Sequence, residues 1–158
     1  MAHFLFNGSK PEAAQGPAAR EHAAARLRTR MWPVDADEVH RDRLRTGDLV
    51  LIYLGAPERE FVGHVRLGSA IREWTASEAR AYPADSLSGV DLSTVEVWDT
   101  AVPMDDVVRR VDPAGKNPYV QANARAGFQR GVVEISAGEY EAVLALHAER
   151  VGDGVTRP

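Results

Sequence analysis

Two apolar runs joined by a short link limit most strongly what this chain can fold into. The run Leu49–Leu54 is almost continuously apolar, which is typical of a strand covered on both faces. A second strand follows at Glu60–Ile71, in which Gly63 and Gly68 predict β-bulges that help a sheet to curl. The link Ala56–Arg59 has the length of a hairpin loop and is too short for a parallel crossover. The centre of the fold is therefore an antiparallel pair within a curved sheet.

Shorter elements are expected on both sides of this pair. Capping boxes predict helix starts at Thr75 and Ser136, because Glu78 and Glu139 stand three residues further on. The segment 112–129 has no clear periodicity, and a loop of that length is a candidate for function. The remaining expected elements are strands at His3–Phe6, Ser93–Asp99 and Gly131–Ile135, helices at Pro17–Arg30 and from Pro103, and a helical turn within Asp37–Leu44.

The order of these elements predicts an α+β fold, a small and strongly curved mixed β-sheet or barrel with helices packed outside it. In the second long strand, strict alternation would put Phe61, Val65, Leu67 and Ile71 on one side of the pleat. We expect the opposite side of that strand to carry residues such as His64.

Composition describes an ordinary globular chain. With 158 residues it has the length of one domain, which we expect at residues 1–150, with 151–158 as a flexible tail. The absence of cysteine excludes disulfides, thiol nucleophiles and cysteine-ligated zinc. The five histidines lack metal spacing, so we expect no metal and no cofactor. No apolar run reaches transmembrane length and the N-terminus has too short an apolar core for a signal peptide, which favours a cytoplasmic location.

Charge is unevenly distributed. The net charge of −4 argues against a general nucleic-acid coat, which is usually basic. Basic residues nevertheless predominate before position 32 and between positions 115 and 131, whereas the stretch from 91 to 112 is acid-rich. The two basic segments would form a basic surface if they met in space; ordinary solvated charge is the alternative. The acidic cluster at 35–38 indicates a solvated loop or a helix start, with cation binding as the alternative.

Trp32 and Trp74 stand in segments that read as irregular, beside strands rather than inside them. Two such residues on loops suggest the walls of a pocket that grips a flat group, and a nucleobase is one flat group of this kind. The structural alternative is packing at the mouth of a barrel. Trp98 lies within a predicted strand, which favours packing.

Five short motifs occur in a fixed order along most of the chain. They are Phe4–Ser9, Met31–Val34, Gly47–Tyr53, Phe61–Gly63 followed by Trp74, and Phe128–Ser136. This ordered set resembles an EVE domain, a member of the PUA-like superfamily that also contains the YTH and ASCH domains.

The resemblance implies a PUA-like barrel that binds nucleic acid and holds a modified base, flipped out of its strand, in an aromatic pocket. Trp32 and Trp74 correspond to the two cage tryptophans of the YTH relatives. Polar groups would read the base edge, and basic side chains would contact phosphates. The expected base-binding residues are Trp32, Trp74, Asn7, Ser9, Tyr53 and Asn117, and the expected phosphate-binding residues are Lys10, Arg30, Lys116, Arg125 and Arg130.

Two other functions stay open. An ASCH-like hydrolase acting on modified nucleosides or RNA would need a poised acid such as Glu60, Glu73 or Glu96. An adaptor would instead bind a nuclease or another effector protein. The sequence predicts a partner in modified DNA or RNA and none in a membrane, and it leaves open which modification and which nucleic acid are bound.

Overall fold

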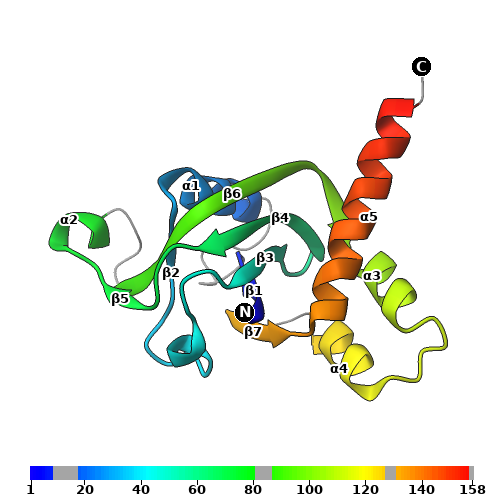
Figure 1. Cartoon of the computed structure of the whole chain (residues 1–158), viewed down its shortest axis with the longest axis horizontal. Helices are drawn as coiled ribbons and strands as arrows, with labels where there is room; N and C mark the ends of the chain where they lie inside the picture. Colours follow the sequence, from blue (N-terminus) through cyan, green and yellow to red (C-terminus); the bar gives the residue numbers. More distant parts are fainter. Residues whose placement is uncertain (9–17, 81–86, 127–130, 157–158) are drawn as a thin grey trace.

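The structure is a computed structural model that describes residues 1–8, 18–80, 87–126 and 131–156. Figure 1 shows how its strands and helices are arranged. In order they are β1 (His3–Asn7), α1 (Ala18–Thr29), β2 (Met31–Pro33), the 3-10 turn η2 (Arg41–Arg43), β3 (Leu49–Leu54), β4 (Glu60–Leu67), β5 (Arg72–Glu73), α2 (Ala76–Ala79), β6 (Ser88–Pro103), α3 (Met104–Val111), α4 (Pro118–Ala126), β7 (Val132–Ile135) and α5 (Ala137–Thr156).

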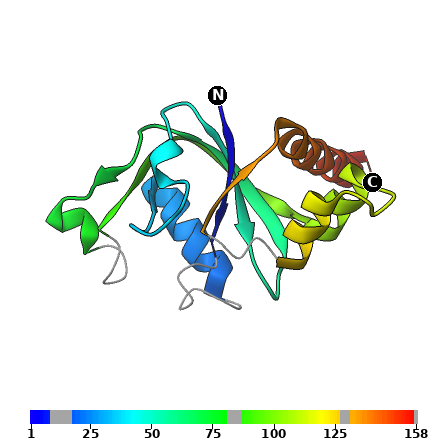
Figure 2. The same ribbon diagram turned by 90° about the horizontal axis from the view of Figure 1, so that it is seen from below.

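The strands form one mixed sheet. Within the described residues its order is β2-β6-β4-β3-β1-β7, and β5 pairs with β6 across from β2. β1 and β3 run parallel, and the other pairs are antiparallel. The sheet curls into a half-barrel with the helices outside it (Figures 1 and 2). The predicted α+β class and the curved mixed sheet are confirmed.

The sheet separates two hydrophobic clusters. Phe4 and Phe6 of β1 lie in the first cluster, which α1 covers. Leu5, between them, lies in the second, which residues of α3 and α5 complete. This alternation is the period-two pattern of a strand buried on both faces. Figure 2 shows α1 on one side of β1 and α3, α4 and α5 on the other.

The prediction that one face of β4 carries Phe61 together with Val65 and Leu67 is wrong for Phe61, at the start of the strand. Phe61 lies in the second cluster, whereas Val65 and Leu67 lie in the first. The pairing with β6 shifts register between Phe61 and Gly63, so a bulge inverts the alternation there. A bulge near Gly63 was expected from the sequence; its effect on the direction of the neighbouring side chains was not.

Other differences lie at element boundaries. The segment 112–129 was expected to be a loop, but Pro118–Ala126 forms α4. Helix α5 continues to Thr156, so residues 151–156 of the expected tail are helical. Trp32 lies in the short strand β2 and not in a loop. No helix in the described parts of the chain is long and apolar enough to cross a membrane.

Candidate functional site

Strand ends converge at one edge of the sheet. β1 and β3 are parallel, so their carboxyl ends meet there, with Asn7 opposite Tyr53. The backbone N–H of Gly8 donates to the carbonyl oxygen of Tyr53 at 2.7 Å. The N–H of Asn7 donates to the carbonyl oxygen of Gly131 at 2.9 Å, which brings the start of β7 to the same edge. Asn7 and Gly8 are both buried.

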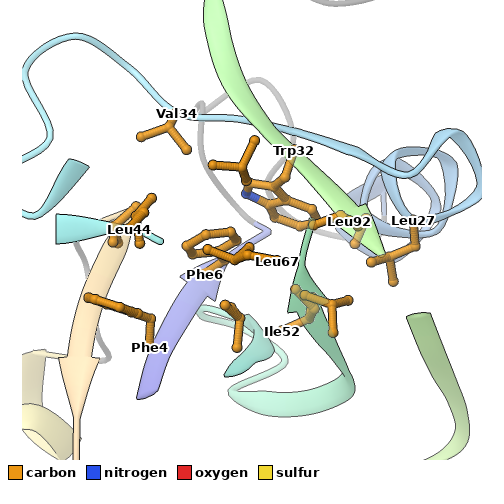
Figure 3. Close-up of a cluster of buried hydrophobic side chains, with 14 of the residues drawn as sticks. Phe4, Phe6, Leu27, Trp32, Val34, Leu44, Ile52, Leu67 and Leu92 are labelled. Atoms are coloured by element: carbon orange, nitrogen blue, oxygen red, sulfur yellow. The ribbon is translucent and has the colours of Figure 1, made fainter. Parts of the chain in front are cut away.

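Trp32 reaches this edge from β2. Its indole is 2% exposed and stacks on Phe6, with ring centroids 5.8 Å apart and an interplanar angle of 29°. Figure 3 shows the indole pointing into the first hydrophobic cluster beside Phe6. A Cβ on Gly8 would stand 3.5 Å from the tip of the indole. The tryptophan is therefore a core residue whose six-membered ring reaches the end of β1.

Arg26 lies over the same indole. Its guanidinium carbon is 5.1 Å from the ring centroid, a cation–π geometry, and the residue is 4% exposed. The chain reverses after α1 at Arg30, which has a φ of 58°, and β2 then returns past the last turn of the helix. In the sequence, Arg26 is distinguished only as a member of the basic segment before position 32. Its contact with Trp32 depends on that reversal, for which an arginine gives no sequence signal.

β2 and β6 pair as an antiparallel ribbon, and Trp74 contacts β6. Its indole lies on Gly89 of β6, where a Cβ would overlap both the indole and the carbonyl oxygen of Trp32. Trp74 is 8% exposed, and its backbone N–H donates to the carbonyl oxygen of Leu87 at 3.0 Å. Both tryptophans thus meet at the β2–β6 ribbon, since Trp32 belongs to β2 and Trp74 lies on Gly89 of β6. That they enclose one base stays a prediction.

Tyr53 does not join Trp32. Its ring lies in the second hydrophobic cluster, fully buried, with its centroid 5.1 Å from that of Phe61. Trp32 lies in the first cluster, on the opposite face of the sheet. A strand buried on both faces sends alternate side chains apart, so Tyr53 and Trp32 do not line one pocket wall, and base binding by Tyr53 stays a prediction.

Asn117 has a structural role. Its side-chain oxygen accepts from the backbone N–H groups of Tyr119 and Val120 at 3.0 and 3.3 Å, which is the arrangement of a helix N-cap. Asp112 accepts from the N–H groups of Lys116 and Asn117 at 3.1 and 2.9 Å. This corner precedes α4, on the side of the sheet opposite to α1 (Figure 2). Asn117 and Lys116 thus lie in a corner away from Trp32, and their roles in binding nucleic acid stay predictions.

The remaining basic candidates are only partly described. The guanidinium of Arg30 donates to the carbonyl oxygen of Ser93 at 2.8 Å and is exposed. Arg125 lies in α4, but its side chain is outside the description. Three further candidates, Ser9, Lys10 and Arg130, lie outside the described residues. A continuous basic border therefore stays a prediction.

A carboxyl group also adjoins this edge. Glu38 accepts from the N–H of Val132 at 3.2 Å, beside Gly131. Burial raises its pKa above the ordinary value, while hydrogen bonds from Val132 and Gly131 act in the opposite sense. The acidic cluster 35–38 is therefore tied to the start of β7 through Glu38 and is not simply a solvated loop.

The acids considered for catalysis are not gathered at this edge. Glu60 pairs with Arg20, and Glu96 binds His64 at 2.8 Å. Glu73 is exposed on β5. In the part of the chain that is described, no group of three or more histidine, aspartate or glutamate residues could hold a metal ion.

Among known proteins, solved structures share the fold of this chain, but no sequence family matches it. No family model matches this chain, and no curated protein matches its sequence. Among solved structures, human THYN1 in complex with 5-methylcytosine-containing DNA has a TM-score of 0.63 and 14% identity, over 93% of this chain and 98% of that one. The YTH domain of Zygosaccharomyces rouxii MRB1 in complex with N6-methyladenosine RNA has a TM-score of 0.57 and 16% identity, over 92% and 86%.

The ASCH protein of Zymomonas mobilis is similar as well, with a TM-score of 0.54 and 11% identity over 92% of this chain and 95% of that one. The three structures share a superfamily, and the chain has their PUA-like fold. The fold that the sequence resemblance implied is confirmed.

Proposed function

We propose that this protein binds nucleic acid and accepts a modified base at the edge of the sheet formed by Gly8, Arg26 and Trp32, here called the Trp32 site. The observation that carries the proposal is the indole of Trp32, which reaches the end of β1 with a buried guanidinium over its ring. Support comes from the fold, because two structures that share it are complexes with methylated DNA or RNA.

The chemistry of the Trp32 site suits a flat ligand. Stacking a base on an aromatic face contributes roughly 1–3 kcal/mol, and a buried methyl group adds about 0.8 kcal/mol. Neither contribution selects tightly by itself, so polar groups must read the base edge. Asn7 is buried at the end of β1 opposite Tyr53, and the alternation of β1 puts its side chain on the face of Leu5 and not on that of Trp32. That Asn7 reads the base edge stays a prediction. A base would meet Trp32 at its tip beside Gly8, or stack on its face after Arg26 has moved aside.

The test is a titration of short labelled oligonucleotides, followed by fluorescence anisotropy. DNA and RNA strands carry 5-methylcytosine, N6-methyladenine or no modification. Wild-type protein should bind one modified strand more tightly than its unmodified counterpart. Trp32→Phe keeps an aromatic ring in the core and should weaken that binding about tenfold, as loss of a stacking surface would.

The matched control is Trp98→Phe, the same truncation at a tryptophan that is 3% exposed in the second cluster. Its melting temperature should fall without a change in oligonucleotide affinity. Equal wild-type affinity for every strand, or equal loss of affinity in both variants, would contradict the proposal. Incubation with modified nucleosides tests the hydrolase alternative, and turnover there would replace binding as the function. An effector partner and a cytoplasmic location stay predictions.

A further inference from the structure

Three charged side chains meet where β5 and α2 contact β6. The Nε and Nη2 atoms of Arg72 donate to Asp91 at 3.0 and 2.8 Å. Its Nη1 and Nη2 atoms donate to Glu78 at 2.9 and 2.7 Å. One planar guanidinium thus holds two carboxylates, each by two hydrogen bonds, a geometry that a lysine cannot reproduce. We call this group of Arg72, Glu78 and Asp91 the Arg72 clamp.

The Arg72 clamp encloses the segment that carries Trp74. Trp74 stands two residues after Arg72 and four before Glu78. Glu78 also accepts from the N–H of Thr75 at 2.9 Å, and its own N–H donates to the Thr75 hydroxyl at 3.2 Å, which completes a capping box. The chain is therefore fixed immediately before and after Trp74.

The third member joins this segment to the ribbon that carries Trp32. Asp91 of β6 pairs with Met31 of β2, one residue before Trp32. The N–H of Asp91 receives further support from the hydroxyl of Ser69, which accepts at 2.9 Å. All three clamp side chains are partly shielded from solvent, with exposed fractions of 33% for Arg72, 24% for Glu78 and 41% for Asp91. Partial shielding and bidentate geometry make such a network more rigid than an isolated surface ion pair.

We propose that Arg72 is a positioning residue, which fixes the indole of Trp74 on Gly89 before any ligand is bound. Its relevance to ligand binding rests on the proposed function, together with the prediction from the sequence that Trp74 is the second wall of the pocket. The fork is the planar guanidinium of Arg72, which donates two hydrogen bonds to each carboxylate. Its removal would release Trp74 from Gly89 and leave the negative charges of Glu78 and Asp91 without their cation.

The experiment labels the protein with 5-fluorotryptophan and records fluorine NMR spectra without nucleic acid. The chain has three tryptophans, and the Trp74 resonance is the one that Trp74→Phe removes. Arg72→Gln removes both charge and fork, whereas Arg72→Lys keeps the charge and loses the fork. Both variants should shift or broaden the Trp74 resonance and leave those of Trp32 and Trp98 in place. Arg109→Gln, which breaks an exposed ion pair with Asp106 on α3, is the control and should change none of them.

Oligonucleotide titrations of the same variants give the second readout. Both Arg72 variants should lower the preference for the modified strand about tenfold, which is the loss expected when a stacking surface is displaced. An unchanged Trp74 resonance in Arg72→Lys would overturn the positioning role and leave only a charge effect. Collapse of all three resonances would also overturn it, because the role would then be general stability. If no strand binds, the proposed function fails, while the fluorine spectra still decide the role of Arg72.

Discussion

Gly89 of β6 lies between the backbone of β2 at Trp32 and the indole of Trp74. β2 passes on one side of it, and the Trp74 ring covers it. The absence of a side chain is required here for space, since no positive φ is recorded for Gly89. A close approach of this kind makes one glycine responsible for the position of Trp74.

Gly89→Ala is predicted to destabilise the protein by about 1–3 kcal/mol, the usual cost of overpacking. The added methyl group would overlap the Trp32 carbonyl oxygen and the Trp74 indole, neither of which is a flexible chain end. Urea unfolding measures the loss. Gly152→Ala is the control, because nothing lies within 4 Å of a Cβ there and α5 favours alanine over glycine. Equal stability of the two variants would contradict this account.

At the scale of elements, α4 changes the interpretation of a whole segment. Pro118 suits the first position of a helix, and Asn117 before it supplies the cap. The sequence predicts a functional loop here because Pro113, Gly115 and Pro118 interrupt any periodicity. The same residues define a turn and a helix start, so the side chain of Asn117, a candidate for base binding, caps a helix.

Asn117→Ala is therefore expected to cost about 1 kcal/mol of stability through loss of the cap. Affinity for oligonucleotides should stay at the wild-type value, since α4 starts away from the Trp32 site. Asn117→Asp keeps the acceptor and should restore the stability. A loss of affinity with unchanged unfolding free energy would return Asn117 to the binding site.

At the scale of the molecule, ionisable groups indicate how stability depends on pH. Hydrogen bonds from Arg72 lower the pKa of Glu78 to about 2, and the hydrogen bond with His64 lowers the pKa of Glu96. A lowered carboxyl pKa gives stability that is present above the unfolded value of 4.5 and is lost as the pH falls through the folded value. These groups therefore contribute to unfolding in acid.

His147 acts at higher pH. Its ring stacks on Trp98 with centroids 4.0 Å apart, which holds α5 on the sheet, and burial lowers its pKa below 6.5. The unfolded chain then binds a proton before the folded one does, so stability falls as the pH drops below that value. Glu38 opposes this trend at lower pH. Burial of its charged carboxylate raises its pKa and destabilises the folded protein, and that destabilisation disappears when the carboxylate is protonated.

The melting temperature is accordingly predicted to fall as the pH is lowered from neutral through the range below 6.5, before the carboxyl groups titrate. His147→Phe keeps a ring against Trp98 and should flatten the curve in this range. His22→Phe, at an exposed position of α1, should leave it unchanged. A wild-type melting temperature that is constant through this range would refute the role assigned to His147.

Local sequence signals determined the elements of this protein. The apolar runs predicted β3 and the start of β4, and the capping boxes predicted α2 and α5. These features depend on residues a few positions apart, whose effect is felt within one turn or one strand. The ordered motifs also implied the PUA-like fold, which the solved structures bear out.

Only the tertiary structure decided which side chains meet. Tyr53 and Trp32 lie on opposite faces of the sheet, and Arg26 covers an indole six residues further along the chain. The bulge near Gly63 inverted one face of β4, and it appears only in the pairing of β4 with its neighbours β3 and β6. A site is built from contacts between segments distant in sequence, and one register shift or one reversed turn changes its members. For that reason the sequence indicated Trp32, while the packing brought Arg26 to it and put Tyr53 and Asn117 elsewhere in the fold.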